Sequence, residues 1–215
     1  MVNVPPMADA APFRLGVLGS GRGSNFVAIA EAINAGQVPA TVATVISDVE
    51  GAGILEHANQ LGITNHHIAP GPYRTKLDDE AEQAYIQALQ QAEVDLIVLA
   101  GFMRILKGEF LKAFEGRVIN IHPSLLPSFP GLAAWQQALD YGVKYTGATV
   151  HFVDQGIDSG AIVAQETVPV EDADSAETLL ERIHGAEHRI YPAAIAAIAR
   201  GEVELQGRRT LRRTA

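Results

Sequence analysis

Residues 14–35 read RLGVLGSGRGSNFVAIAEAINA, in which an apolar run, a glycine-rich loop and a periodic apolar pattern follow one another directly. The run 14–19 is short and mostly apolar, as in a strand buried on both faces of a parallel sheet. The stretch that follows has the period of an amphipathic helix, with Ser24 as its N-cap and Gly36 as its stop. Its apolar face consists of Phe26, Ile29, Ala30 and Ile33. A strand that leads through a tight loop into a helix is the first unit of a βα repeat.

The same alternation continues along the chain. Apolar runs that are expected as further strands span 40–47, 64–69, 95–100 and 117–121. Amphipathic stretches at about 53–61 and 75–91 are expected as helices between them. Because helices alternate with buried strands, the sequence predicts an α/β fold: a single domain with a Rossmann-like, largely parallel, twisted sheet and helices on both faces.

The pattern changes in the last third of the chain. Two β-rich stretches, 144–153 and 161–168, flank a short acidic loop, 154–160. They predict an antiparallel hairpin that extends the sheet. A long helix follows, with Asp174 or Ser175 as its cap.

Length and composition fit this single domain. The chain has 215 residues, 47% of them hydrophobic, and no internal repeat or linker. We expect the domain to span 13–205, after a flexible tail at 1–12 and before a basic tail at 206–215 that is either solvated or a docking arm. The first tail lacks the basic and apolar regions of a signal peptide, so no leader or anchor is expected.

Composition also excludes several classes of partner. No stretch reaches the roughly 20 apolar residues of a membrane helix, so we expect a soluble protein without a membrane partner. The net charge of −9 argues against nucleic acid, because duplex affinity rests on Lys and Arg that neutralise phosphates. The absence of cysteine excludes disulfides and thiolate metal sites and fits a reducing cytoplasm. Small molecules remain as the expected partners of a monomer or homodimer.

An anion site is predicted at the loop 19–25, which reads GSGRGSN. Its glycines let the backbone approach a ligand, and the free amides and dipole of a helix start favour an anion such as phosphate. No Lys follows as in a P-loop, and Ser24 stands at the third glycine position of a dinucleotide fingerprint. Two alternatives stay open: a dinucleotide site with Asp48 as the ribose-binding acid, or a tight turn without a ligand.

Chemistry is predicted after the run 117–121, where the chain reads Asn120-Ile121-His122-Pro123. Open α/β sheets bind ligands beyond the carboxyl ends of their strands. Asn120 and His122 are two apart in an extended chain, so their side chains share a face. An amide that donates to an oxyanion and a titratable imidazole are sufficient for acyl transfer without a covalent intermediate. A purely structural Asn-x-His is the alternative.

Asp158, in the loop 154–160, is the candidate partner of His122. A carboxylate beside an imidazole orients the ring and favours its protonated form. An Asp in a turn beside glycines can equally be structural.

A further histidine pattern lies near the end of the chain. His184, Glu187 and His188 match the H-x-x-E-H motif of inverted zinc peptidases. Such enzymes need another acidic ligand well downstream, and only Glu202 and Glu204 follow. We therefore expect no metal.

Five features together resemble the phosphoribosylglycinamide formyltransferase family, the folate-dependent glycinamide ribonucleotide transformylases. They are GRGSN at 21–25, LAGFMRIL at 99–106, NIHPSLLP at 120–127, HFV at 151–153 and Asp158. The likeness runs from about Phe13 to Leu205, in order. It implies transfer of the formyl group of 10-formyltetrahydrofolate, the co-substrate, to the amine of glycinamide ribonucleotide in de novo purine (IMP) biosynthesis.

The resemblance also implies a set of site residues. The catalytic residues would be Asn120, His122 and Asp158. The residues that bind the ribonucleotide would be Gly21, Gly23, Ser24 and Asn25, with Glu187 on the ribose. The residues that bind the folate would be Arg74, Met103, Arg104, Ile105, Leu106, Asn120, Val153, Asp154, Gln155, Gly156 and Ile157. Two places depart from the family pattern, the segment 132–134 and His184. These departures affect the expected ribonucleotide contacts and not the expected chemistry.

Asn120 and a protonated His122 would stabilise the oxyanion of the tetrahedral intermediate, each by about 2.7–4 kcal/mol. Relatives with the same folate chemistry are alternatives. Formyltetrahydrofolate deformylase and methionyl-tRNA formyltransferase carry an additional domain, for which 215 residues leave no room. A nucleotide-binding regulatory module would keep the glycine loop but would not need Asn120, His122 and Asp158 together.

Overall fold

The computed structural model describes residues 12–213. The main sheet contains β1 (Phe13–Leu18), β2 (Ala40–Ser47), β3 (Asn65–His67), β4 (Leu96–Leu99), β5 (Val118–His122), β6 (Tyr145–Phe152) and β7 (Ile162–Pro169). The helices are α1 (Ser24–Asn34), α2 (Gly53–Gln60), α3 (Asp79–Gln91), α4 (Gly108–Ala113), α5 (Ala134–Tyr141) and α6 (Ala176–Ala199). All seven predicted strands are present within a few residues of their expected bounds. The short helix α4 is not among the predicted elements.

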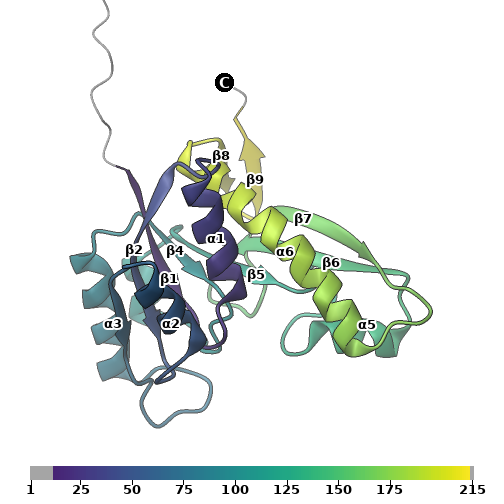
Figure 1. The fold of residues 1–215 in the computed structure, drawn as a ribbon, viewed down its shortest axis with the longest axis horizontal. Coiled ribbons are helices and arrows are strands. Elements are labelled where there is room, and N and C mark those ends of the chain that lie inside the picture. The colour runs from purple at the N-terminus through teal and green to yellow at the C-terminus, as the bar shows by residue number, and fades with distance from the viewer. Residues whose placement is uncertain (1–11, 214–215) are drawn as a thin grey trace, which may run out of the picture.

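The sheet has the order β3-β2-β1-β4-β5-β6-β7. The strands from β3 to β5 run parallel, whereas β6 is antiparallel to both β5 and β7. Figure 1 shows β6 and β7 extending the sheet away from the parallel part. The predicted α/β fold with an antiparallel hairpin extension is confirmed. The chain order reverses between β1 and β4, and open α/β sheets place ligands at such a switch point.

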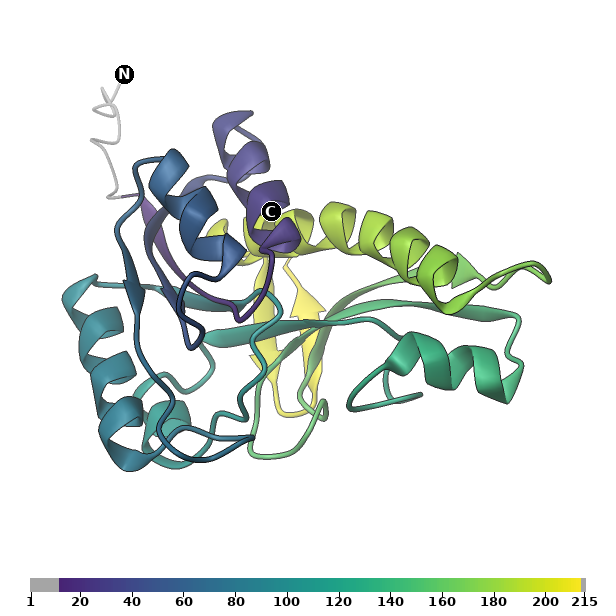
Figure 2. The ribbon, with the colours of Figure 1, turned by 60° about the horizontal axis from the view of Figure 1, so that its bottom comes forward.

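Helices cover both faces of the sheet, so each central strand buries both sets of alternate side chains. One core lies between the sheet and α1, α2 and α6, and contains Phe26, Ile54 and Ile183. The other lies between the sheet and α3 and α4, and contains Tyr85 and Phe110. Figure 2 shows α1, α2 and α6 above the strands and α3 below them.

The helix starts differ in part from those predicted. Gly23, not Ser24, is the N-cap of α1: it has a left-handed φ of 84°, and no side chain caps the helix. Helix α3 starts later than predicted, because Asp78 caps it by accepting a hydrogen bond from the amide of Ala81. Ser175 caps α6 and forms a reciprocal capping box with Thr178.

The basic segment at 206–215, expected as a tail that is either solvated or a docking arm, forms part of a hairpin as far as Arg212. Two strands, β8 (Val203–Gln206) and β9 (Arg209–Arg212), form an antiparallel hairpin. The Thr210 hydroxyl donates to the carbonyl of Ile162, which ties β9 to β7. Two exposed ion pairs accompany the hairpin, Arg213 with Glu204 and, just before β8, Arg200 with Glu202. The predicted tail at 1–12 lies outside the described residues, except for Pro12.

Between residues 12 and 213, no helix is both long and apolar enough to cross a membrane.

Candidate active site

Three strands bring the predicted site residues together by ending at the same level. Leu18 of β1 pairs with Leu99 of β4, and Leu99 pairs with Asn120 of β5. The glycine loop, the segment 101–106 and the Asn120–His122 pair therefore leave the sheet side by side. Further contacts join the first two: the amide of Ser20 donates to the carbonyl of Gly101, and the Ser20 hydroxyl accepts from the amide of Met103.

A cleft of about 500 Å³ opens beside these strand ends. Its walls come from the segment 101–106, the end of β5, the segment 131–135 and the loop 153–159. Most predicted folate contacts line it, namely Met103, Arg104, Ile105, Leu106, Asn120, Val153, Asp154, Gly156 and Ile157. Arg74 and Gln155, also predicted to contact folate, are exposed and do not line the cleft. The single tryptophan, Trp135, lines it too.

His122 and Asp158 form the predicted pair. The side chains of His122 and Asp158 are 5% and 14% exposed, and the His122 Nδ1 lies 3.4 Å from the Asp158 Oδ2. The other ring nitrogen, Nε2, lies 2.9 Å from the carbonyl oxygen of Phe129. Both ring nitrogens thus face acceptors, to which a protonated ring can donate twice.

Asp158 is fixed by the loop that follows β5. The amide of Gly131 donates to the Asp158 Oδ2 over 2.8 Å. Asp158 itself has a left-handed φ of 49°, which Asp tolerates better than most residues. The segment that contains Phe129 and Gly131 consequently holds both members of the pair.

His151 completes the cluster and was not predicted as a functional residue. Its Nε2 lies 3.4 Å from the Asn120 Nδ2 and 3.8 Å from the Asp158 Oδ1. Its Nδ1 donates to the carbonyl of Phe152 over 2.8 Å. Burial lowers the pKa of His151, although the hydrogen bond to Phe152 and the charge of Asp158 oppose this. A neutral His151 protonated at Nδ1 leaves Nε2 to accept from the Asn120 amide, which fixes the orientation of that amide.

The glycine loop presents the start of α1 to solvent. The amides of Ser24 and Asn25 belong to the first turn, where the helix offers them no acceptor. At Gly23, a Cβ atom would lie 2.9 Å from the Cα of Ile54, and the positive φ also disfavours other residues. The geometry fits the predicted anion site, for which free amides and the helix dipole are the binding groups.

Glu187 reaches this loop from α6. Its carboxylate accepts a hydrogen bond from the Asn25 Nδ2 over 2.8 Å. Burial raises the pKa of Glu187 to about 7, and the hydrogen bond from Asn25 opposes the rise. The structure therefore places side by side two residues that were predicted to bind different parts of the ribonucleotide.

The remaining members of the histidine motif do not form a metal centre with Glu187. The rings of His184 and His188 stack with centroids 6.3 Å apart, while the Glu187 carboxylate faces Asn25. Over residues 12–213, no group of three or more His, Asp or Glu side chains has the arrangement of a metal site.

Asp48, the acid of the alternative dinucleotide site, pairs with Arg104. The Arg104 Nε donates to the Asp48 Oδ2 over 2.6 Å, and the Asp48 side chain is 1% exposed. A carboxylate that is buried and paired in this way does not face a ribose. The dinucleotide interpretation therefore loses its acidic residue.

Comparisons with known proteins agree with this geometry. Residues 13–195 match the family model described as formyl transferase. The phosphoribosylglycinamide formyltransferase of Mycobacterium tuberculosis strain H37Rv is 46% identical over 209 residues, which cover 96% of this chain and 93% of that protein. The trifunctional purine biosynthetic protein adenosine-3 of Homo sapiens is 43% identical over 192 residues; the match covers 89% of this chain and only 19% of that protein.

A solved structure is similar over almost the whole chain. Glycinamide ribonucleotide transformylase 1 from Symbiobacterium toebii has a TM-score of 0.89 and 46% sequence identity, and the match covers 94% of each chain.

Proposed function

The chain belongs to the formyl transferase family, and from that premise we propose that it transfers the formyl group of 10-formyltetrahydrofolate to the amine of glycinamide ribonucleotide. The observation that carries this proposal is the cluster of Asn120, His122 and Asp158 in one cleft beside the glycine loop. Acyl transfer to an amine needs hydrogen-bond donors and a positive charge beside the developing oxyanion. Asn120 offers a donor, and a protonated His122 paired with Asp158 offers the charge. Two relatives that match over 93–94% of their own length are a phosphoribosylglycinamide formyltransferase and a glycinamide ribonucleotide transformylase.

The two substrates have separate places in this proposal. The ribonucleotide phosphate binds the amides at the start of α1, and Glu187 accepts from a ribose hydroxyl. The folate lies in the cleft between the segment 101–106 and the loop 153–159. The amine and the formyl carbon then meet at the end of β5, where Asn120 and His122 line the cleft.

In the reaction, the amine nitrogen forms a bond to the formyl carbon, and the carbonyl oxygen becomes negative. The Asn120 Nδ2 donates to that oxygen, with its orientation set by His151. The His122 Nε2–H breaks its hydrogen bond to the Phe129 carbonyl and donates to the oxyanion instead. The Asp158 carboxylate balances the positive charge of the protonated ring. The bond between carbon and the folate nitrogen breaks, and the proton lost by the amine ends on that nitrogen. Positioning and charge stabilisation supply the rate, and no metal takes part.

The test is a spectrophotometric assay of folate product with purified enzyme, 10-formyltetrahydrofolate and glycinamide ribonucleotide. Product that forms only when both substrates are present supports the proposal, and treatment with a chelator leaves the rate unchanged. Release of formate at the same rate without the amine would identify a deformylase instead. We also propose a cytoplasmic location for the enzyme. A chain without cysteine forms no disulfides, so it needs no oxidising compartment.

A further inference from the structure

Asp48 has no part in the chemistry described above, yet it is a buried charge close to the cleft. It follows β2 directly, and its side chain is 1% exposed. One oxygen, Oδ2, accepts from the Arg104 Nε over 2.6 Å; among residues 12–213 the other, Oδ1, is buried without a hydrogen-bond partner. Burying a carboxylate and leaving one oxygen without a donor is unfavourable, so the fold retains Asp48 at a cost in stability.

Arg104 connects Asp48 to a loop beside the cleft. Its Nη1 donates to the carbonyls of Tyr73 and Arg74, over 3.0 and 2.5 Å. These carbonyls lie in the segment 70–76, which has no helix or strand of its own. Two backbone contacts continue the attachment: the amide of Ile105 donates to the carbonyl of Thr75, and Ile105 forms an isolated β-bridge with Lys76.

Without this arginine, the segment 70–76 would be held mainly by the contacts with Ile105 and by the amide of Asp78, which donates to the carbonyl of Pro70. Its side chains from Gly71 to Lys76 are exposed, so little apolar burial fixes its position. Asp48 holds the guanidinium at Nε, and this directs Nη1 to the two carbonyls. Thr75 lines the cleft, and the side chain of Arg74 is a predicted contact for a folate carboxylate.

We propose that Asp48 is a positioning residue for the folate co-substrate: through Arg104 it fastens the segment 70–76 to the wall of the cleft, so that Arg74 and Thr75 stand ready for the ligand. The proposal rests on the proposed function for the identity of the ligand. The attachment itself rests on the contacts of Asp48, Arg104 and Ile105 and does not depend on the identity of the ligand.

The kinetic test uses Asp48→Asn, which keeps an acceptor oxygen but removes the charge, and Asp48→Ala, which removes both. We expect the KM for 10-formyltetrahydrofolate to rise about tenfold or more in Asp48→Ala and less in Asp48→Asn. The kcat and the KM for glycinamide ribonucleotide should stay within about twofold of the parent values. The positioning role would be overturned if kcat and both KM values were impaired by the same factor, or if the KM for the folate did not change.

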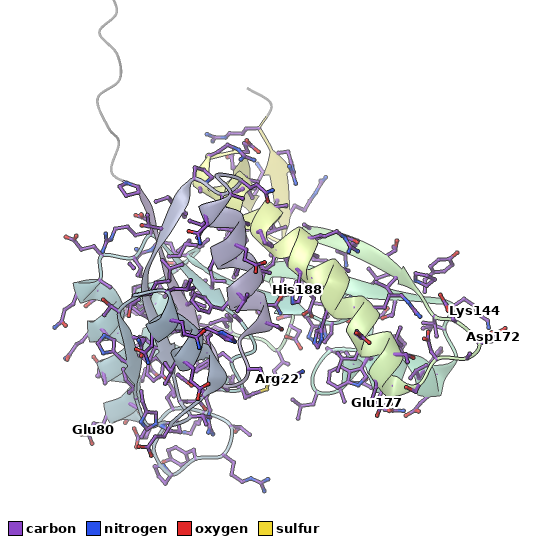
Figure 3. All side chains as sticks on the ribbon, in the orientation of Figure 1. Arg22, Glu80, Lys144, Asp172, Glu177 and His188 are labelled. Carbon is purple, nitrogen blue, oxygen red and sulfur yellow. The ribbon has the colours of Figure 1, made fainter. Side chains whose placement is uncertain are left out.

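Asp174→Asn is a matched control. Asp174 is 3% exposed at its side chain and pairs with Arg182, whose Nη1 also donates to a backbone carbonyl, that of Pro169. This pair lies at the start of α6, the end marked by Asp172 and Glu177 in Figure 3, away from Arg22 of the glycine loop. The variant loses a buried ion pair of the same kind, so a fall in general stability appears in it too. Its KM for the folate should equal that of the parent.

A second readout needs no ligand and no activity. Arg74 and Lys76 are trypsin sites within the fastened segment. We expect native Asp48→Ala to be cut after these residues about tenfold faster than the parent and Asp48→Asn by a smaller factor, while Asp174→Asn is cut there at the parent rate. Unchanged cleavage in folded Asp48→Asn would overturn the attachment. If the parent enzyme transfers no formyl group, the proposed function fails, and this cleavage still decides whether Asp48 fastens the segment.

Discussion

The Asn25 Nδ2 donates to the Glu187 Oε2 over 2.8 Å, although 162 residues separate the two in the chain. Asn25 belongs to the first turn of α1, and Glu187 lies in the middle of α6 with 4% exposure. The bond joins the glycine loop to the last long helix of the domain. The burial of the Glu187 carboxyl raises its pKa, and this makes the stability of the fold depend on pH.

The first prediction concerns Glu187→Gln. Burial raises the pKa of Glu187 from 4.5 to about 7 in the folded protein. Between these values the unfolded chain releases a proton that the folded chain keeps, so this contribution to the free energy of unfolding falls as pH rises and is constant above about pH 7. The difference between parent and variant should fall by about 2 kcal/mol between pH 5 and pH 7.5. Urea unfolding at pH 5 and pH 7.5 measures it, and a constant difference would refute the assignment.

The second prediction compares two glycines of the same loop. Gly23→Ala should destabilise the fold by about 1–3 kcal/mol, because its φ is 84° and the new Cβ would meet the backbone of Ile54 at 2.9 Å. Gly21→Ala is the control, since a Cβ there has no atom within 4 Å. Thermal unfolding of both variants should separate them clearly. Equal melting temperatures would mean that the loop does not have this conformation.

The third prediction concerns the anion site. Crystals soaked in phosphate should show the anion against the amides of Ser24 and Asn25, because free amides and the helix dipole converge there. An equimolar soak with chloride in place of phosphate serves as the control. Phosphate that binds only elsewhere, with this loop left bare, would count against a nucleotide phosphate at α1.

The fourth prediction concerns His151, which acts on Asn120. His151→Leu removes the acceptor that orients the Asn120 amide, so kcat should fall about tenfold while the KM values change little. In an Asn120→Ala background the same change should have almost no effect on kcat, because the amide is already gone. A tenfold loss in both backgrounds would show that His151 acts by another route.

The sequence predicts the part of the site that depends on parallel strands. Buried apolar runs mark β1, β4 and β5, and parallel strands that end together bring the glycine loop close to Asn120 and His122 whatever their detailed packing. The resemblance to a known family implies that Asp158 is the partner of His122, and the 3.4 Å separation of the two side chains agrees with this prediction.

The contacts that were not predicted depend on register and on long side chains. His151 lies beside Asn120 because of the pairing between two antiparallel strands, and a shift of one residue would have turned it to the other face. Arg104 lines the cleft as predicted, but Asp48 and two loop carbonyls bind its guanidinium, which the sequence did not predict. The six-residue helix α4 is too short to show a period in its sequence. The basic residues near the C-terminus are typical of a solvated tail, and only their pairing as β8 and β9 reveals a hairpin.

The most direct measurement is a double-mutant cycle on His122 and Asp158, with kcat/KM for formyl transfer measured in the parent, His122→Asn, Asp158→Asn and the double variant. The account predicts a loss of about 100-fold or more in each single variant, and a double variant no worse than the more damaged single one, because groups that act as one unit lose their effect together. Fully multiplicative losses, or an Asp158→Asn enzyme with parental activity, would contradict the coupled action of His122 and Asp158.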